Sequence, residues 1–379
     1  MTRRGPHEGS IHQRKDGRWV GSVHLGYAPG KRVRKHVFGK TRAEVVAKMR
    51  PLLKARDEQR PIPDQRLKLG PFLHTWLEDV ARPRIRVTTY PSYRSIVELH
   101  LVPGLGRIGV AKLTPTDVQA FLNAKHAGGL SPRRVQYIHA ILRRALVTAE
   151  RWGLVSRNVA TLVDAPRVPK REISPLTPDE ARRLIIAAAD DRYRALWIAA
   201  LGTGLRQGEL LGLRWRDMDL DGRRLRVRHT LARVDGKLTL LEPKTERSRR
   251  TLVLPGVVVD ALRGHATRQK MERLIAGPLW VDSGHVFATT IGTPIEAAAV
   301  TRAFRRALER AALPRSRFHD LRHAAATFLL AQGFTLEDVK NLLGHSSITL
   351  TSNTYGHVLE QRQEQVASGM DAVLSGVRL

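Results

Sequence analysis

The chain has 379 residues, of which 65 are Lys or Arg and 35 are Asp or Glu, so its formal net charge is +30. This length predicts two or three domains of roughly 100 to 200 residues each. So large a positive charge opposes compaction and favours a polyanionic partner, nucleic acid first. Because cysteine is absent, disulfides and thiolate metal sites are excluded.

A basic protein can instead bind an anionic membrane surface. That alternative requires an amphipathic basic helix with an aromatic face or a lipidation motif, and the sequence contains neither. The first residues, MTRRGPHEGS, lack the apolar core of a signal peptide, and the longest apolar-leaning run, ALWIAALGTGL (195–205), is far shorter than a span of roughly 20 residues. We therefore expect a cytoplasmic protein that is associated with the nucleoid when bound to DNA.

Residues 1–66 are strongly basic, with 17 Lys and Arg against 6 Asp and Glu, a net charge of +11. The segments RWVGSVHLG (18–26) and RVRKHVFG (32–39) are β-branched and bounded by turn residues, so they predict a small sheet. Thr41 and Glu44 then have the spacing of a capping box, which predicts a helix. We expect residues 1–60 to form a small α+β DNA-binding domain, the alternative being a merely solvated basic face, and residues 61–66 to form a Pro-containing linker. The candidate DNA-binding residues here are Arg18, Lys31, Arg32, Arg34 and Lys35.

Residues 67–168 have the pattern of a helical domain. A first helix is predicted by apolar residues that repeat every three and four positions, and Thr114 with Pro115 starts another. The longest helix is predicted from Pro132, with Ser131 as its cap, to Gly153. Its polar face carries cations that either contact phosphate or are only solvated. The first helix's apolar residues are Phe72, Leu73, Trp76, Leu77 and Val80, and the cations of the long helix are Arg133, Arg134, Arg143 and Arg144.

Residues 169–379 are predicted to form a mainly helical α+β domain. Its first helix begins with a capping box made by Thr177 and Glu180. Strand signals run from LRVRHTLARV (225–234) through KLTLLEPKTERSRRTLVLP (237–255). The chain as a whole is therefore expected to be multidomain and mainly α, with small β-sheets.

Polar residues interrupt apolar helical patterns at several places in this last segment. Two arginines, a lysine, two histidines and a tyrosine, with no carboxylate cluster, fit phosphoryl transfer, because guanidinium groups bind non-bridging oxygens bidentately. A lysine can protonate the leaving oxygen, and a tyrosine, with its ordinary pKa of about 10, can be the nucleophile if cations or a base assist it. These residues are Arg206 in TGLRQGEL, Lys244 in EPKT, His319 and Arg322 in HDLRH, His345 in LLGH and Tyr355 in NTYGH.

The order and spacing of these six residues, within about 175–360, resemble the tyrosine recombinase, or phage integrase, family. The resemblance implies that Tyr355 attacks a scissile DNA phosphate to form a 3′-phosphotyrosyl link, with no metal or ATP. It implies that Arg206 and Arg322 hold the phosphate oxygens, Lys244 protonates the leaving oxygen, His319 assists proton transfer and His345 donates a hydrogen bond to the phosphate. We expect Glu209 to orient one of the cations.

The resemblance also implies an arrangement of domains and partners. Residues 1–60 correspond to an arm-type DNA-binding domain, residues 67–168 to a core-binding domain and residues 169–379 to the catalytic domain. The implied partners are duplex DNA attachment sites and further copies of the chain in a homotetramer on DNA, with a DNA-bending host factor and an excisionase as additional candidates. An amphipathic tail helix (359–377) is predicted to dock on a neighbouring protomer or on its own domain.

Five alternative interpretations of these residues are to be weighed. Arg247, Arg249 and Arg250 lie close to Lys244 and are rival cations of that segment. His319 and His323 have the spacing of two zinc ligands on a helix, although Arg322 between them opposes a metal ion. DMDLD (217–221) alternates carboxylates like a metal loop, but we interpret it as a turn. A type IB topoisomerase and a non-catalytic DNA-binding regulator are the alternative functions.

Overall fold

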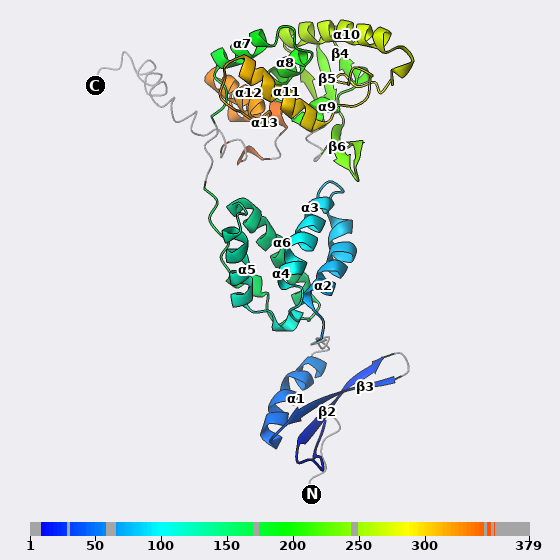
Figure 1. Ribbon diagram of the computed structural model, residues 1–379, viewed down its shortest axis with the longest axis vertical. Coiled ribbons are helices and arrows are strands. Elements are labelled where there is room, and N and C mark those ends of the chain that lie inside the picture. Colours follow the sequence, from blue (N-terminus) through cyan, green and yellow to red (C-terminus); the bar gives the residue numbers. More distant parts are fainter. Residues whose placement is uncertain are drawn as a thin grey trace, which may run out of the picture. The chain divides into compact units, whose positions relative to one another are not determined.

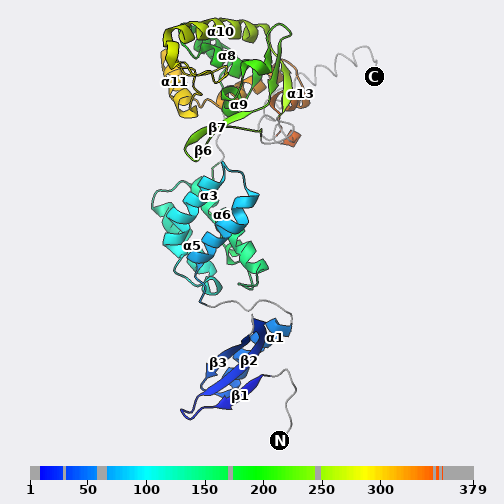
Figure 2. The same ribbon diagram turned by 90° about the vertical axis from the view of Figure 1, so that its right-hand side faces the viewer.

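The computed structural model describes residues 9–28, 31–57, 66–169, 174–243, 249–344, 347–349 and 352. The chain divides into two compact units, residues 1–170 and 171–379. Figures 1 and 2 show the elements of each unit. Within the described ranges no helix has the length and apolar character that crossing a membrane requires.

The N-terminal part is a three-stranded antiparallel sheet packed against one helix. Strands β1 (Ser10–Gln13), β2 (Trp19–Ala28) and β3 (Lys31–Gly39) lie in the order β1-β2-β3, and α1 (Arg42–Asp57) packs on β2 and β3. The buried core is small and consists of Val23, Val45 and Met49. A Cβ on Gly21 would lie 2.3 Å from Met49 Sδ, so α1 approaches the sheet closely at this residue. The predicted sheet and helix are confirmed, whereas β1 was missed because four residues carry too short an alternation.

The rest of the first unit is a helical bundle. Its core is built from the apolar residues predicted for two of the helices, and Phe72, Leu73, Trp76 and Leu77 are buried. Thr114 caps α5 with Asp117 as its capping-box partner, and Ser131 caps α6, as predicted. The elements are α2 (Leu69–Thr75), η1 (Trp76–Ala81), η2 (Arg82–Arg84), α3 (Tyr90–Ile96), η3 (Val97–Leu101), α4 (Val102–Leu105), η4 (Val110–Lys112), α5 (Pro115–Ala127), α6 (Pro132–Arg151) and η5 (Val159–Leu162).

The second unit combines helices with two small antiparallel sheets, one of order β4-β5-β8 and one made by the β6–β7 hairpin. Thr177 and Glu180 form the predicted capping box at the start of α7. The elements are α7 (Pro178–Ala187), α8 (Arg194–Thr203), α9 (Gln207–Leu211), η6 (Trp215–Asp217), β4 (Met218–Asp219), β5 (Arg224–Val227), β6 (Thr230–Val234), β7 (Lys237–Leu241), β8 (Arg250–Val253), α10 (Gly256–Ala276), η8 (Gly277–Leu279), α11 (Ala297–Arg310), α12 (Asp320–Ala331) and α13 (Leu336–Leu343).

Helix α8 is the centre of this second unit. Its residues are apolar on all sides, which is typical of a helix that is surrounded by other elements, and it packs against α10 and α12. The Trp197 ring lies 5.3 Å from the ring of Phe304 and 5.7 Å from that of Phe318. These contacts hold α8 in the core, and the chain that follows its C-terminus contains the first predicted site residue.

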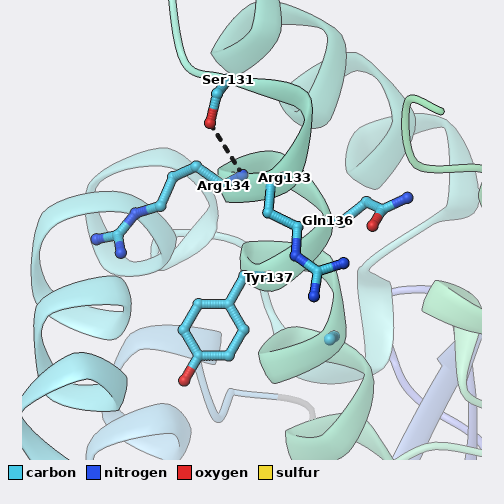
Figure 3. Close-up of a pocket in the computed structure, with 6 residues that line it drawn as sticks. Ser131, Arg133, Arg134, Gln136 and Tyr137 are labelled. Atoms are coloured by element: carbon cyan, nitrogen blue, oxygen red, sulfur yellow. Dashed lines mark hydrogen bonds between the residues drawn. The ribbon is translucent and has the colours of Figure 1, made fainter. Parts of the chain in front are cut away.

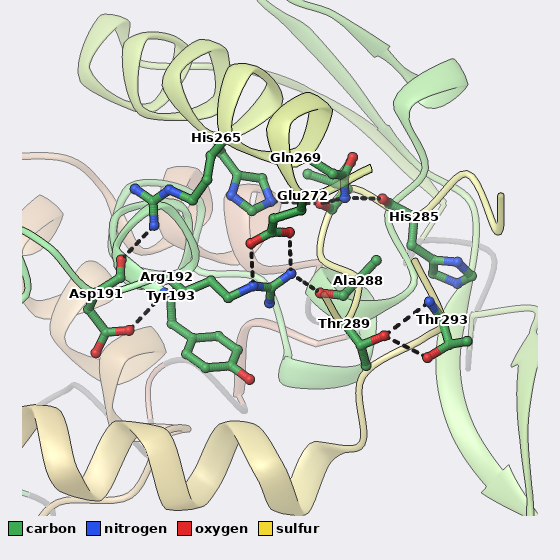
Figure 4. A network of polar contacts seen from close by, with 12 residues as sticks. Asp191, Arg192, Tyr193, His265, Gln269, Glu272, His285, Ala288, Thr289 and Thr293 are labelled. Carbon is green, nitrogen blue, oxygen red and sulfur yellow. Dashed lines mark hydrogen bonds and ion pairs between the residues drawn. The ribbon is translucent and has the colours of Figure 1, made fainter. Parts of the chain in front are cut away.

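A polar network joins α10 to the loop that precedes α11 (Figure 4). Arg192 makes two hydrogen bonds to the Glu272 carboxylate, at 2.6 and 2.7 Å, and donates to the Ala288 carbonyl at 2.6 Å. Gln269 donates to the carbonyl oxygen of His285 at 3.2 Å. Because these partners are partly or fully buried, the network fixes the loop against α10.

Some predictions fall outside the described residues. These are the linker at 61–66 apart from Arg66 and the tail helix at 359–377. The interpretation of DMDLD as a turn is only partly right. Asp217 ends η6, and Met218 with Asp219 forms the short strand β4. The turn follows, and in it Asp219 Oδ1 accepts a hydrogen bond from the Gly222 backbone N–H at 2.8 Å. Asp217 is buried and pairs with Arg228 at 3.5 Å.

Candidate active site and nucleic-acid interface

Arg206 lies at the junction of two helices. Helix α8 ends at Gly204, whose φ of +60° is the left-handed conformation that glycine adopts readily. Arg206 is then the extended N-cap of α9. Its Nη1 donates to Glu209 Oε1 at 2.8 Å, and its backbone N–H donates to Glu209 Oε2 at 3.1 Å. Glu209 is 3 % exposed, so the carboxylate holds the more exposed arginine in a fixed position from within the core.

Two glycines of α9 bring the β6–β7 hairpin against this helix. A Cβ on Gly208 would lie 2.5 Å from Thr230 Oγ1, and a Cβ on Gly212 would lie 3.0 Å from the His229 carbonyl oxygen. The hairpin turns at Asp235 and Gly236, which both have positive φ, as a two-residue hairpin turn requires. The hairpin is therefore seated beside the helix that begins with Arg206.

Arg322 lies inside the molecule, with 3 % of the residue exposed. It lies near the start of α12, whose N-cap is His319. Its Nη1 donates to the Gly204 carbonyl at 2.6 Å and its Nη2 donates to the Leu343 carbonyl at 2.8 Å. These oxygens are at the C-terminal ends of α8 and α13, where helix dipoles place partial negative charge. These two hydrogen bonds help to offset the burial of the guanidinium, and they fix both Nη atoms.

Arg250 completes the set of arginines. It begins β8, where Thr251 and Val253 face outward and Leu252 is buried, so the alternation places Arg250 on the inner face. Its side chain is 9 % exposed. Its Nε donates to the Leu342 carbonyl at 2.9 Å, and its Nη2 lies 3.5 Å from Glu209 Oε2. Burial lowers the pKa of Arg250, and the Glu209 carboxylate opposes that effect.

These contacts form a closed network, which we call the Arg206–Arg322 network. Arg206 contacts the buried carboxylate of Glu209, which also contacts Arg250. Arg250 donates to the last turn of α13, and Arg322 donates to the next carbonyl of the same helix. Arg322 also donates to Gly204, two residues before Arg206. Its members are Gly204, Arg206, Glu209, Arg250, Leu342, Leu343 and Arg322.

His319 lies within the electrostatic reach of both predicted arginines. Desolvation by the surrounding atoms, with the charges of His323, Arg322 and Arg206, lowers the pKa of His319 to about 4, although part of the residue stays exposed. Its ring lies 5.1 Å from the ring of His323 in an edge-to-face arrangement. His319 is therefore neutral at physiological pH, and it can accept or donate a hydrogen bond.

A pocket of about 300 Å³ borders the two histidines. It lies between the segment before α7 and the start of α12, and Arg315 and Arg317 also line it. Among the residues that the structure describes, no group of three or more His, Asp or Glu has the arrangement of a metal site. The zinc alternative would thus require ligands beyond His319 and His323.

The cations of α6 have two kinds of environment. Arg133 and Arg134 line a shallow pocket at the start of the helix, together with Tyr137 (Figure 3). Arg143 and Arg144 are exposed, but Arg144 also donates to the Tyr93 hydroxyl at 2.9 Å. Arg144 therefore contributes to packing, whereas the others present their charge to solvent.

The candidates of the N-terminal sheet are only partly described. Arg18 is exposed and lies 3.8 Å from Asp16, a separation at which an exposed ion pair contributes little. Arg34 is exposed and Lys35 is partly buried, on adjacent positions of β3. The side chains of Lys31 and Arg32 lie outside the described residues.

Three of the predicted catalytic residues, Lys244, His345 and Tyr355, also lie outside the described residues. Of the others, the structure brings Arg206, Glu209, His319 and Arg322 together. The sequence prediction treated Arg250 only as a rival of Lys244. In the strand segment RTLV, however, Arg250 is two positions before Leu252, so both side chains lie on the same face of the strand. This alternation is the signal in the sequence that could have identified Arg250 as an inward-facing residue.

Comparisons with known proteins identify a family for this chain. Residues 175–362 match the model of the phage integrase family, and residues 68–126 match the phage integrase N-terminal SAM-like domain. A XerC-like tyrosine recombinase of Caldanaerobacter subterraneus is 32 % identical over 356 residues, covering 88 % of this chain and 90 % of that protein. An integrase of Streptomyces ambofaciens is 32 % identical over 390 residues, covering 98 % of this chain and 97 % of that protein.

Solved structures share the fold. The Tn1549 transposon integrase in complex with a circular intermediate DNA has a TM-score of 0.68 at 23 % identity, covering 79 % of this chain and 99 % of that one. A lambda integrase dimer bound to a COC′ core site has a TM-score of 0.57 at 20 % identity, covering 93 % and 96 %. From the extent of these matches and the convergence of Arg206 with the HDLRH segment, the chain belongs to the phage integrase family of tyrosine recombinases.

Proposed function

We propose that this recombinase integrates or excises a mobile element by cutting and rejoining duplex DNA through a 3′-phosphotyrosyl link to Tyr355. The observation that carries the proposal is the Arg206–Arg322 network, which fixes two guanidinium groups, far apart in sequence, around one location beside His319. The relatives named as integrases, and the Tn1549 and lambda integrase structures that contain DNA, support DNA as the substrate.

In the proposed reaction, the Tyr355 oxygen attacks the scissile phosphorus and the bond to the 5′-oxygen breaks. The tyrosyl proton passes to a base, for which neutral His319 is the candidate, and Lys244 gives a proton to the departing 5′-oxygen. The phosphodiester energy is kept in the new ester. A 5′-hydroxyl of a partner strand then attacks the same phosphorus and releases Tyr355, so no ATP is consumed.

Arg206 and Arg322 stabilise the charge that develops on the non-bridging oxygens. Fixed donors aimed at developing charge are worth more than mobile ones, because they need no reorganisation during the reaction. Glu209 and the helix-end carbonyls provide this fixation for the two arginines. His345 is the proposed further donor to the phosphate, assigned from its place in the LLGH motif.

We further propose that three domains share the DNA. Residues 1–60 bind arm-type sites through the sheet and its cations, residues 67–168 bind the core site through α6, and residues 169–379 cut it. A second DNA-binding module raises the effective concentration of the protein at its site and can bridge distant sites. A solved lambda integrase tetramer bound to a Holliday junction supports a homotetramer on DNA. A DNA-bending host factor and an excisionase are proposed accessory partners.

The test uses a suicide substrate made from the ends of the source element, in which a nick near the cleavage point lets the 5′-hydroxyl fragment diffuse away. The wild-type chain should accumulate a denaturant-stable protein–DNA adduct, and Tyr355→Phe should bind the same DNA without forming it. An adduct in the Phe variant would identify a different nucleophile.

A type IB topoisomerase would form the same adduct, so a second readout separates the two activities. A recombinase exchanges strands between two attachment sites, whereas a topoisomerase relaxes supercoiled plasmid that lacks such sites. The separate basic segment at residues 1–66 favours recombination.

A further inference from the structure

Arg250 occupies a position that is costly for an arginine. It is on the inner face of β8, opposite Val227 of β5 and in phase with buried Leu252. A buried charge requires pairing and hydrogen bonds to offset its desolvation. Its immediate neighbour Arg249 is exposed, with an ion pair to Glu242. An arginine one position earlier in the chain therefore carries the same charge in solvent.

The partners of Arg250 belong to both halves of the site. Nη2 faces the carboxylate of Glu209, which holds Arg206, and Nε donates to the Leu342 carbonyl in the last turn of α13. The adjacent carbonyl, that of Leu343, accepts from Arg322. Arg250 thus contacts both the carboxylate that holds Arg206 and the helix end that holds Arg322, the two proposed phosphate-binding arginines.

The planar guanidinium suits this connection. Its N–H donors point in fixed directions, so Nε and Nη2 can hold a carbonyl and a carboxylate at a set separation. A lysine would offer three rotatable donors on one nitrogen, without the fixed separation and direction of Nε and Nη2. An apolar side chain of similar length would remove the cation that lies 3.5 Å from Glu209 Oε2.

We propose that Arg250 is a positioning residue for the recombination reaction, which sets the orientation of Arg206 through Glu209 and fixes the end of α13 that Arg322 binds. It acts without touching DNA. This inference rests on the proposed roles of Arg206 and Arg322 as phosphate ligands, and it adds a third arginine whose role is different from theirs.

The test compares the full-length wild-type chain with Arg250→Met and Arg250→Lys, and uses Arg302→Met, at an exposed arginine of α11, as the control. Single-turnover cleavage of the nicked substrate is measured at saturating DNA, alongside the DNA dissociation constant. Arg250→Met should cleave roughly 10- to 100-fold more slowly, the loss expected from one or two hydrogen bonds to charged groups. DNA affinity should stay near the wild-type value. Arg302→Met should cleave at the wild-type rate.

A second substrate distinguishes positioning from a general structural defect. In it a methylphosphonate replaces the scissile phosphate, so the phosphorus group is neutral and depends less on aligned guanidinium groups. The deficit of Arg250→Met relative to wild type should shrink on this substrate. Arg206→Met is measured in parallel, because its deficit reports the proposed phosphate contact itself.

Each outcome has a distinct meaning. If Arg206→Met is defective while Arg250→Met and Arg250→Lys cleave like wild type, the inference is overturned and the proposed function stands. If Arg206→Met cleaves like wild type, the proposed function fails. An Arg250→Met deficit that is equal on both substrates shows a structural role only and also overturns the inference. If Arg250→Met does not fold, Arg250→Lys, which keeps the charge, decides by the same two substrates.

Discussion

The Arg322 guanidinium donates a 2.6 Å hydrogen bond to the carbonyl oxygen of Gly204, 118 residues earlier in the chain. This contact connects the start of α12 to the C-terminal end of α8. Since Arg206 follows Gly204 by two residues, the same contact brings the two predicted arginines to one location. The site therefore depends on the C-terminal end of α8, for which the sequence pattern alone indicates only a structural role.

Arg322→Lys should impair cleavage far more than its conserved charge suggests. Lysine cannot hold the carbonyls of Gly204 and Leu343 in the fixed planar geometry of a guanidinium. We expect DNA binding to remain, cleavage to fall by about 100-fold or more, and the free energy of unfolding to fall by about 2 to 4 kcal/mol. Suicide-substrate kinetics and urea unfolding measure these effects.

Arg302→Lys is the control, because Arg302 is exposed on α11. It should leave both the cleavage rate and the free energy of unfolding near the wild-type values. If Arg322→Lys behaved like Arg302→Lys, the fork geometry would not matter to the reaction.

Local signals in the sequence were enough for much of the fold. Thr114, Ser131 and Thr177 begin helices where predicted, because caps act within one turn of the chain. The buried face of α6 follows its helical period. The two-residue turn at Asp235 and Gly236 is also readable as Asp-Gly between strand-like segments.

Contacts that depend on tertiary structure were not predictable in the same way. Glu209 was predicted to orient a cation, and it contacts Arg206, but its second contact, with Arg250, requires β8 to lie beside α9. Likewise, no residue pattern identifies Leu342 and Leu343 as acceptors, because their backbone carbonyls are used. Backbone groups at helix ends bind by position rather than by side-chain type.

Gly204→Ala should destabilise the catalytic unit although it adds only one methyl group. Gly204 has a positive φ, and a Cβ there would lie 2.6 Å from Leu343 Cδ2. The left-handed conformation and the overlap together should lower the free energy of unfolding by about 1 to 3 kcal/mol. Because the Leu343 carbonyl accepts from Arg322, cleavage should also slow.

Gly256→Ala provides a comparison of opposite sign. Gly256 begins α10, and a Cβ there would meet no atom within 4 Å. Alanine favours helix more than glycine, by up to about 1 kcal/mol. Urea midpoints should therefore rise or stay constant for Gly256→Ala and fall for Gly204→Ala, and equal midpoints would contradict the close approach at Gly204.

His319 should titrate at an unusually low pH. Its pKa of about 4 in the folded chain lies below the ordinary 6.5, so between these values the unfolded chain binds more protons. The stability from this group is then complete above pH 6.5 and decreases as the pH falls towards 4. In an NMR titration of the DNA-free protein, the histidine signal missing from His319→Gln should have its midpoint near pH 4.

The stability prediction uses the same variant. Wild type should lose more stability than His319→Gln between pH 7 and pH 5, measured by urea unfolding. Burial also lowers the pKa of His265, His285 and His323, but these groups are present in both proteins and cancel in the comparison. Parallel pH dependences for the two proteins would show that His319 is not desolvated.

Deleting residues 1–60 should separate core cleavage from integration. The described part of this segment has its own small core, made of Val23, Val45 and Met49, and the buried clusters of the two later domains include none of its residues. The truncated chain should therefore fold and cleave a short core site at nearly the wild-type rate. Integration should fall strongly, since the proposed arm-binding module, which would raise the effective concentration, is lost. A recombination assay between two full attachment sites, run beside the suicide-substrate assay, measures both, and unchanged integration would mean that the N-terminal sheet does not bind the arm sites that integration uses.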